Sequence, residues 1–139
     1  MATDNKAPAP GTFQDRLAVR DAYRKWLEDL KVNSFVTFNF GYDIKPLSAS
    51  ESIIQFCKML EDRALGSKWY KYRGSQRMTL VAFGEHMSSN PHWHAVARVP
   101  LLTARALFDE GPKIWLGIEP RGQLVAERID DRNAVIRYC

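Results

Sequence analysis

A short run of histidines and aromatic residues constrains this chain more than any other feature. All three histidines of the sequence lie in it, at His86, His92 and His94. In a strand, residues two apart point to the same face, so the imidazoles of His92 and His94 would share one side of a sheet. Trp93 would point the opposite way, into a core. Same-face neighbours are about 7 Å apart along a strand, close enough for two imidazoles to ligate one ion.

The residues upstream of this run predict its partner strand. Met78–Glu85 is apolar and contains valine, phenylalanine and threonine, and the serines, asparagine and proline that follow are typical of a turn. We expect an antiparallel hairpin with Glu85 across from His92 or His94, and with His86 as the polar start of the turn rather than a residue that supports the ligands. Two imidazoles and a carboxylate on one face would form a divalent-metal site with open positions. The alternative is that these side chains are ordinary polar surface.

Hydrophobic periodicity predicts a helix and then a strand in the first third of the chain. Thr12 can cap a helix over Phe13–Leu30, whose apolar residues recur with helical spacing. Phe35–Phe40 alternates and is predicted to be a strand. One face of this strand is apolar and should meet helices, whereas Thr37 and Asn39 lie on a face polar enough to border a site.

A second helix is predicted after a loop. Ser48-Ala49-Ser50-Glu51 has the pattern of a capping box, in which the serine and glutamate satisfy each other's free backbone donors. The apolar spacing continues to Leu65, and Gly66 is a suitable C-terminal stop. Cys57 lies on the apolar stripe and is expected to be a buried thiol.

The third quarter of the chain predicts a strand, a short helix and an ambiguous segment. His92–Val99 is the second hairpin strand. Leu101–Phe108 has the character of a short helix, with Thr103 as a candidate cap and Gly111-Pro112 as its stop. Ile114–Ile118 is predicted either as a strand or as a connection with Trp115 buried.

The end of the chain predicts one more strand and one more helix. Leu124–Ile129 alternates well enough to be a strand. Asp130 or Asp131 can cap a last helix that carries Tyr138. That helix would stop after about two turns at Cys139, so we expect a segment truncated within its last helix.

A basic and aromatic run between the second helix and the hairpin is a candidate nucleic-acid contact. Cations can neutralise phosphates while aromatic rings stack on unpaired bases. The alternative is a solvated loop in which the tryptophan fills a gap in the core. The candidate residues are Lys68, Trp69, Tyr70, Lys71, Tyr72, Arg73 and Arg77.

Composition and charge limit the class of protein. The chain has 139 residues and a formal net charge of +4, which suit one basic domain that can bind an anionic partner. Two cysteines make no disulfide framework, so a reducing compartment is expected. No run of apolar residues is long enough to predict a membrane span or a secretion signal. Residues 1–11 are expected to be a flexible tail and residues 12–139 one domain.

The order of the predicted elements favours an α+β fold. Hairpin strands in the middle of the chain indicate an antiparallel sheet of about four or five strands, with helices packed on one face. The ferredoxin-like or RRM-like arrangement fits this order.

Three motifs resemble those of the HUH endonucleases, which comprise rolling-circle replication initiators, relaxases and related transposases. Glu85 followed by Pro91-His92-Trp93-His94 is similar to the family's motif II, and Phe35–Phe40 is similar to its motif I strand. Ala134–Tyr138 resembles the helix that carries the family's nucleophilic tyrosine. The order and spacing match the single-tyrosine replication initiators (Rep proteins), over about Phe35 to Cys139.

This resemblance implies the HUH endonuclease fold and a specific chemistry. His92, His94 and Glu85 would bind Mg²⁺ or Mn²⁺, and Tyr138 would nick single-stranded DNA through a 5′-phosphotyrosine to initiate rolling-circle replication. The DNA would also contact the basic run, Thr37 and Asn39. The family commonly has a lysine three or four positions after the tyrosine, beyond the end of this sequence, so the role of such a lysine stays open.

The implied partners are single-stranded DNA or an origin hairpin, with a replicative helicase or host replication proteins as further partners and no membrane. The implied location is the cytoplasm of a bacterium, for a phage- or plasmid-encoded protein, or the host nucleus for a eukaryotic virus.

Three alternatives stay open from the sequence. The first is a non-catalytic, RRM-like binder of single-stranded nucleic acid. The second is a metal-dependent hydrolase with the same ligands and water as the nucleophile. The third is an HUH transposase or relaxase, in which Tyr23 would be the reserve nucleophile because relaxases place theirs near the N-terminus.

Overall fold

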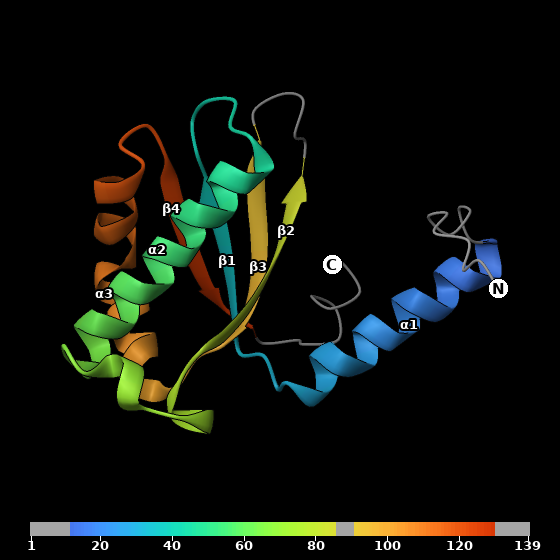
Figure 1. The fold of residues 1–139 in the computed structure, drawn as a ribbon, viewed down its shortest axis with the longest axis horizontal. Coiled ribbons are helices and arrows are strands. Elements are labelled where there is room, and N and C mark those ends of the chain that lie inside the picture. Colours follow the sequence, from blue (N-terminus) through green and yellow to red (C-terminus); the bar gives the residue numbers. More distant parts are fainter. Residues whose placement is uncertain (1–11, 86–90, 130–139) are drawn as a thin grey trace, which may run out of the picture.

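Four antiparallel strands form one sheet in the computed structural model, which describes residues 12–85 and 91–129. The strands β1 (Ser34–Asn39), β2 (Thr79–Glu85), β3 (His92–Arg98) and β4 (Gln123–Arg128) lie in the order β2-β3-β1-β4. The helix α2 (Pro46–Leu65) connects β1 to β2, and α3 (Leu101–Ile118) connects β3 to β4 (Figure 1). This βαββαβ order is the ferredoxin-like α+β fold that the sequence predicts.

The main core lies between the sheet and the two crossover helices, which lie side by side on one face (Figure 1). On β1 the alternation places Val36 and Phe38 on this face, as predicted, and both are buried. The indole of Trp115 packs edge-on against Phe38, Phe40 and Phe56. Aromatic packing of this kind joins β1, α2 and α3 into one unit.

A first helix, α1 (Phe13–Asp29), precedes the sheet and projects away from it (Figure 1). Thr12 caps it as predicted, in a reciprocal capping box with Asp15. Only its C-terminal end packs closely: Leu27 and the following Val32 form a small cluster with Val96. The strand register places Val96 on the face opposite α2 and α3, so α1, alone among the helices within residues 12–85 and 91–129, is not on the predicted face.

The start of α2 differs from the prediction. The helix begins at Pro46 and has Lys45 at its N-cap, so Ser48 and Glu51 lie inside the helix and form no capping box. Proline suits the first helical position because its fixed φ is helical and the N–H that it lacks would have no intrahelical partner there. The predicted end is confirmed, since the helix stops at Leu65 and Gly66 follows with φ 90°.

The third helix is longer than predicted. It runs through Gly111-Pro112 to Ile118, so neither the stop at this pair nor the strand over Ile114–Ile118 is correct. The N-cap of the helix is Pro100, so the buried Thr103 lies inside the helix and is not the cap. A residue before proline is kept out of the helical region partly by its Cβ, which Gly111 lacks. A Cβ on Gly111 would also lie 3.3 Å from a methyl group of Leu107, so glycine suits this tightly packed turn.

The remaining predictions about the fold are mostly confirmed. Cys57 is partly buried against the core, and burial raises the pKa of its thiol to about 12. Trp93 packs against the main core from the face away from the two histidines, as predicted. The last strand, β4, is present. The predicted tail over residues 1–11 and the predicted last helix lie outside the described residues.

Over residues 12–85 and 91–129, none of the helices has both the length and the apolar character that crossing a bilayer would require.

Candidate metal centre

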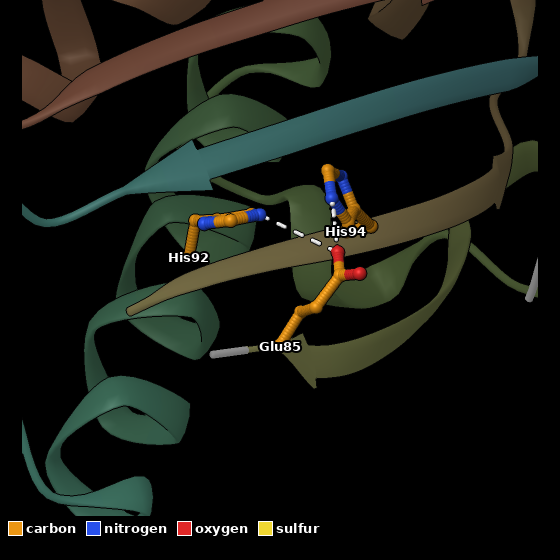
Figure 2. A group of neighbouring side chains, drawn as sticks. All are labelled: Glu85, His92 and His94. Atoms are coloured by element: carbon orange, nitrogen blue, oxygen red, sulfur yellow. Dashed lines mark ion pairs between the residues drawn. The ribbon is translucent and has the colours of Figure 1, made fainter. Parts of the chain in front are cut away.

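The register of the hairpin brings the three predicted ligands together. Glu85 is the pairing partner of His92, and Phe83 is the partner of His94. Since same-face residues in β3 are two apart, His92, His94 and Glu85 all lie on the sheet face that α2 and α3 leave open. Figure 2 shows the three side chains pointing toward one another, the carboxylate from β2 and both imidazoles from β3.

The donor atoms of this cluster lie close together. Glu85 Oε2 is 2.7 Å from His94 Nε2 and 3.4 Å from His92 Nε2 (Figure 2). The candidate ligand atoms of all three residues lie within 4.8 Å of one another. Donor atoms that share an ion at about 2.1 Å are expected about 3 Å apart, so two of the separations already have suitable values. The two imidazole rings are nearly perpendicular, at 78°.

The residues around His94 hold its ring in place. Thr37 Oγ1 on β1 is 3.1 Å from His94 Nδ1. Phe35 stacks on the same imidazole, with ring centroids 5.3 Å apart and planes 20° apart. If the proton is on Nδ1 and donated to the threonine, Nε2 keeps its lone pair toward Glu85 and can ligate an ion.

The chemistry of this donor set fits a small divalent cation. Two imidazoles and one carboxylate leave several coordination positions for water or substrate, and carboxylate with water suits Mg²⁺ and Mn²⁺. The side chains of Glu85, His92 and His94 are 38%, 23% and 16% exposed, so a ligand can reach the cluster from the open face. The cluster could therefore hold a metal ion, whose identity these residues do not decide.

Thr37 gives a direct test of how the imidazole of His94 is oriented. Thr37→Val keeps the shape of the side chain but removes the oxygen beside Nδ1, so we expect Mn²⁺ affinity to fall about tenfold. Thr37→Ser keeps the oxygen and should stay within about twofold of the wild-type affinity. Isothermal titration with Mn²⁺ measures both. An unchanged affinity in the valine variant would show that this contact does not orient the ligand.

Asn39, the second polar residue predicted on this face of β1, pairs with His92 on β3 and with Gln123 on β4. Its side-chain oxygen accepts a hydrogen bond from the backbone N–H of Gly41, 2.9 Å away. This bond stabilises the turn after β1. Asn39 thus lies beside the cluster, where the prediction of a DNA contact stays a prediction.

The basic and aromatic run lies at the other end of the sheet. Its last residue, Arg77, precedes the start of β2, whereas Glu85 is the final residue of that strand. Glu85 is six residues after Thr79 along the strand, a distance of about 20 Å. The run and the cluster are therefore not one continuous site.

Within the run, Arg77 and Trp69 contact each other, and Arg77 also contacts the helix α2. Arg77 makes a two-point hydrogen bond to Glu61 on α2, and its guanidinium lies 4.9 Å from the ring centroid of Trp69. The other candidates are exposed: Lys68, Tyr70, Lys71, Tyr72 and Arg73.

Of the two candidate tyrosines, only Tyr23 lies in the described part of the chain. Tyr138 and the predicted turn residue His86 lie outside the described residues. Tyr23 is 56% exposed on α1 and lines a groove between that helix and β2. Phe83, whose pairing partner is His94, lines the same groove.

Sequence reasoning did not identify Phe35 as a neighbour of the histidines, although its place in the alternation of β1 puts it on their face. It also gave the arginines of α1 no functional role. Their four-residue spacing was the available signal, and the groove that they line requires the packing of α1 beside β2.

Compared with protein-family models, curated proteins and solved structures, the chain shows no significant match.

Proposed function

We propose that this domain nicks and rejoins single-stranded DNA in a reaction that depends on Mg²⁺ or Mn²⁺, as an initiator of rolling-circle replication. The observation that supports this proposal best is the cluster of Glu85, His92 and His94 on the open face of a ferredoxin-like sheet. Its similarity to motif II of the HUH endonucleases, with the motif I strand paired beside it, favours the single-tyrosine initiators within that superfamily.

The chemistry follows from the properties of a phosphodiester. Its charged non-bridging oxygens repel a nucleophile, and a divalent ion bound by the cluster would withdraw charge from one of them. Tyr138 would attack phosphorus through its phenol oxygen, forming an O–P bond as the bond from phosphorus to the 3′ oxygen breaks. The phenol proton passes to solvent water, and the departing 3′ oxygen takes up a proton. The product is a 5′-phosphotyrosine and a free 3′-hydroxyl, which can attack the linkage in turn and restore the phosphodiester.

The number of residues between Ile129 and Tyr138 is large enough for Tyr138 to reach the cluster. Ile129, which follows β4, packs against the cluster of Leu27, Val32 and Val96, and its backbone N–H donates to the carbonyl of Asn33. The chain from Ile129 to Tyr138 can span about 13 Å as a helix and about 30 Å when extended. The distance along β3 from Val96 to His92 is about 13 Å.

The test of this proposal is a covalent adduct. A pool of single-stranded oligonucleotides labelled at the 3′ end is incubated with the protein and Mn²⁺, because the fragment that stays on the tyrosine keeps that end. We expect a labelled band on a denaturing gel that chelator abolishes and that Tyr138→Phe reduces to background. Tyr23→Phe, a matched removal of one hydroxyl, should leave the adduct unchanged.

Other outcomes separate the alternatives. An adduct that survives Tyr138→Phe but not Tyr23→Phe would assign the nucleophile to α1, as in a relaxase. Cleavage without an adduct would favour a hydrolase that activates water. Binding that is insensitive to chelator, without cleavage, would favour the RRM-like binder.

A further inference from the structure

The helix α1 and the edge strand β2 enclose a groove of about 580 Å³. We call it the α1–β2 groove; it is lined by Arg16, Val19, Arg20, Tyr23, Arg24, Leu27, Val81, Ala82 and Phe83. Three arginines line it, whereas none of the carboxylates of α1 does so. These carboxylates belong to Asp15, Asp21, Glu28 and Asp29. The charge of α1 is therefore segregated, and the helix presents three of its four cations to the groove.

The arginines form a row along the helix. Arg16, Arg20 and Arg24 are four residues apart, which places them on one side of α1 at intervals of about 6 Å along the axis. Arg24 contacts Asp21 only at 3.8 Å. Over the part of the chain that the structure describes, the buried Nε of Arg24 has no hydrogen-bond partner. A row of guanidinium groups at this spacing suits an extended polyanion better than a single anion.

The groove also offers aromatic and apolar surface beside these charges. Tyr23 is 56% exposed, and Phe83 lies across from it on β2. Aromatic rings beside a row of cations are the combination that binds single strands, because every unpaired base has a face for stacking. A duplex keeps its bases stacked inside and would use the charges alone.

One residue that lines the groove, Phe83, lies beside the candidate metal centre. Phe83 pairs with His94, and Glu85 is the next residue of β2 on the same face, about 7 Å further along. A strand lying in the groove would therefore arrive at the cluster along the edge of the sheet. The basic run before β2 is at the far end of that strand and does not offer this approach.

We infer that the α1–β2 groove binds the backbone of single-stranded nucleic acid, with Arg16, Arg20 and Arg24 neutralising successive phosphates and Tyr23 stacking on a base. The inference rests on the proposed function for its substrate class, since it names where the strand that reaches the metal centre is held.

The test is equilibrium binding without metal, so that cleavage plays no part. Fluorescence anisotropy of a labelled 20-nucleotide single strand is measured in EDTA over a range of salt concentrations. The variant carries Arg16→Gln, Arg20→Gln and Arg24→Gln, since glutamine keeps a helix propensity close to that of arginine. The matched control carries Lys25→Gln, Arg105→Gln and Lys113→Gln, which remove the same charge from exposed positions outside the groove.

We expect the groove variant to bind more than tenfold more weakly at low salt and the control to stay within about threefold of wild type. Each lost phosphate contact on a single strand lowers the salt slope by about 0.7, so the slope should fall by about 2 in the groove variant only. Equal losses in both variants, no binding by the wild type, or a duplex bound as tightly and with the same dependence on the arginines would overturn the inference. Circular dichroism checks that both variants keep their helices.

The two proposals can fail separately. Arginine-dependent binding without any DNA adduct would reject the proposed nicking and keep the groove. An adduct formed by a wild type whose binding ignores the three arginines would reject the groove and keep the nicking.

Discussion

Replacing His94 by alanine is expected to abolish metal binding and, with it, any DNA adduct. Its Nε2 lies 2.7 Å from the Glu85 carboxylate, and its ring is held by Thr37 and Phe35. Alanine removes one of three ligands from a site whose other positions would be filled by water. The remaining imidazole and carboxylate should bind Mn²⁺ at least a hundredfold more weakly, because a weak divalent site depends on every protein ligand.

The measurement is Mn²⁺ titration by calorimetry or electron paramagnetic resonance, followed by the adduct assay at saturating DNA. Gln123→Ala is the matched control, since Gln123 lies on the same open face across β1, two strands and about 10 Å from β3. Its Mn²⁺ affinity should stay within about twofold of wild type. A His94→Ala protein that is folded and binds Mn²⁺ normally would remove the basis of the proposed metal centre.

The second large effect concerns stability and the role of Arg77. Its Nε and terminal nitrogen donate to both oxygens of Glu61, at 2.7 and 2.9 Å, and the Glu61 side chain is 5% exposed. The hydrogen bond to Glu61 raises the pKa of Arg77, against an opposing effect of burial, so the guanidinium stays charged. The pair joins α2 to the segment that leads into β2, and Arg98 extends it by donating to the Arg77 carbonyl.

Arg77→Gln should lower the free energy of unfolding by about 2–4 kcal/mol. Breaking a buried ion pair typically costs 3–5 kcal/mol, and the value is reduced here because the Arg77 side chain is 31% exposed. The loss arises because the carboxylate of Glu61 is left buried without its cation. Urea unfolding at pH 7 measures it.

Two further variants decide how the loss arises. Lys71→Gln removes an exposed cation from the same run and should change stability by less than about 0.5 kcal/mol. Glu61→Gln added to Arg77→Gln removes the unpaired carboxylate. The double variant should recover most of the lost unfolding free energy, because two neutral amides can form a hydrogen bond with each other. If Arg77→Gln is as stable as wild type, the arginine is free to act as the DNA contact that the sequence predicts.

Local sequence patterns were sufficient for the ligands and most of the sheet. The spacing of His92 and His94 places both rings on one face of any strand, and the turn residues before them favour the antiparallel pairing that β2 and β3 adopt. The alternation of β1 likewise separates Thr37 from the buried Phe38. These features depend on backbone geometry over a few residues, which is why a single sequence reveals them.

Where local signals competed with packing, packing decided. Gly111-Pro112 is a stop signal by itself, yet α3 continues because Leu107, Ile114 and Trp115 on both sides of the pair are buried. Burial of these side chains outweighs the local tendency of a Gly-Pro pair to end a helix. The start of α2 is a different case: the helix begins three residues earlier than the capping pattern predicts, at Pro46, whose fixed φ suits the first helical position.

What the sequence determined by itself is the set of side chains that can hold an ion and the faces on which they lie. The tertiary structure decided their neighbours: Glu85 opposite His92, the basic run at the far end of β2, and the arginines of α1 beside Phe83. The reason is physical. Side-chain direction repeats with the period of one strand or helix, whereas register and the placement of α1 depend on contacts between segments distant in the chain, whose energies no local pattern contains.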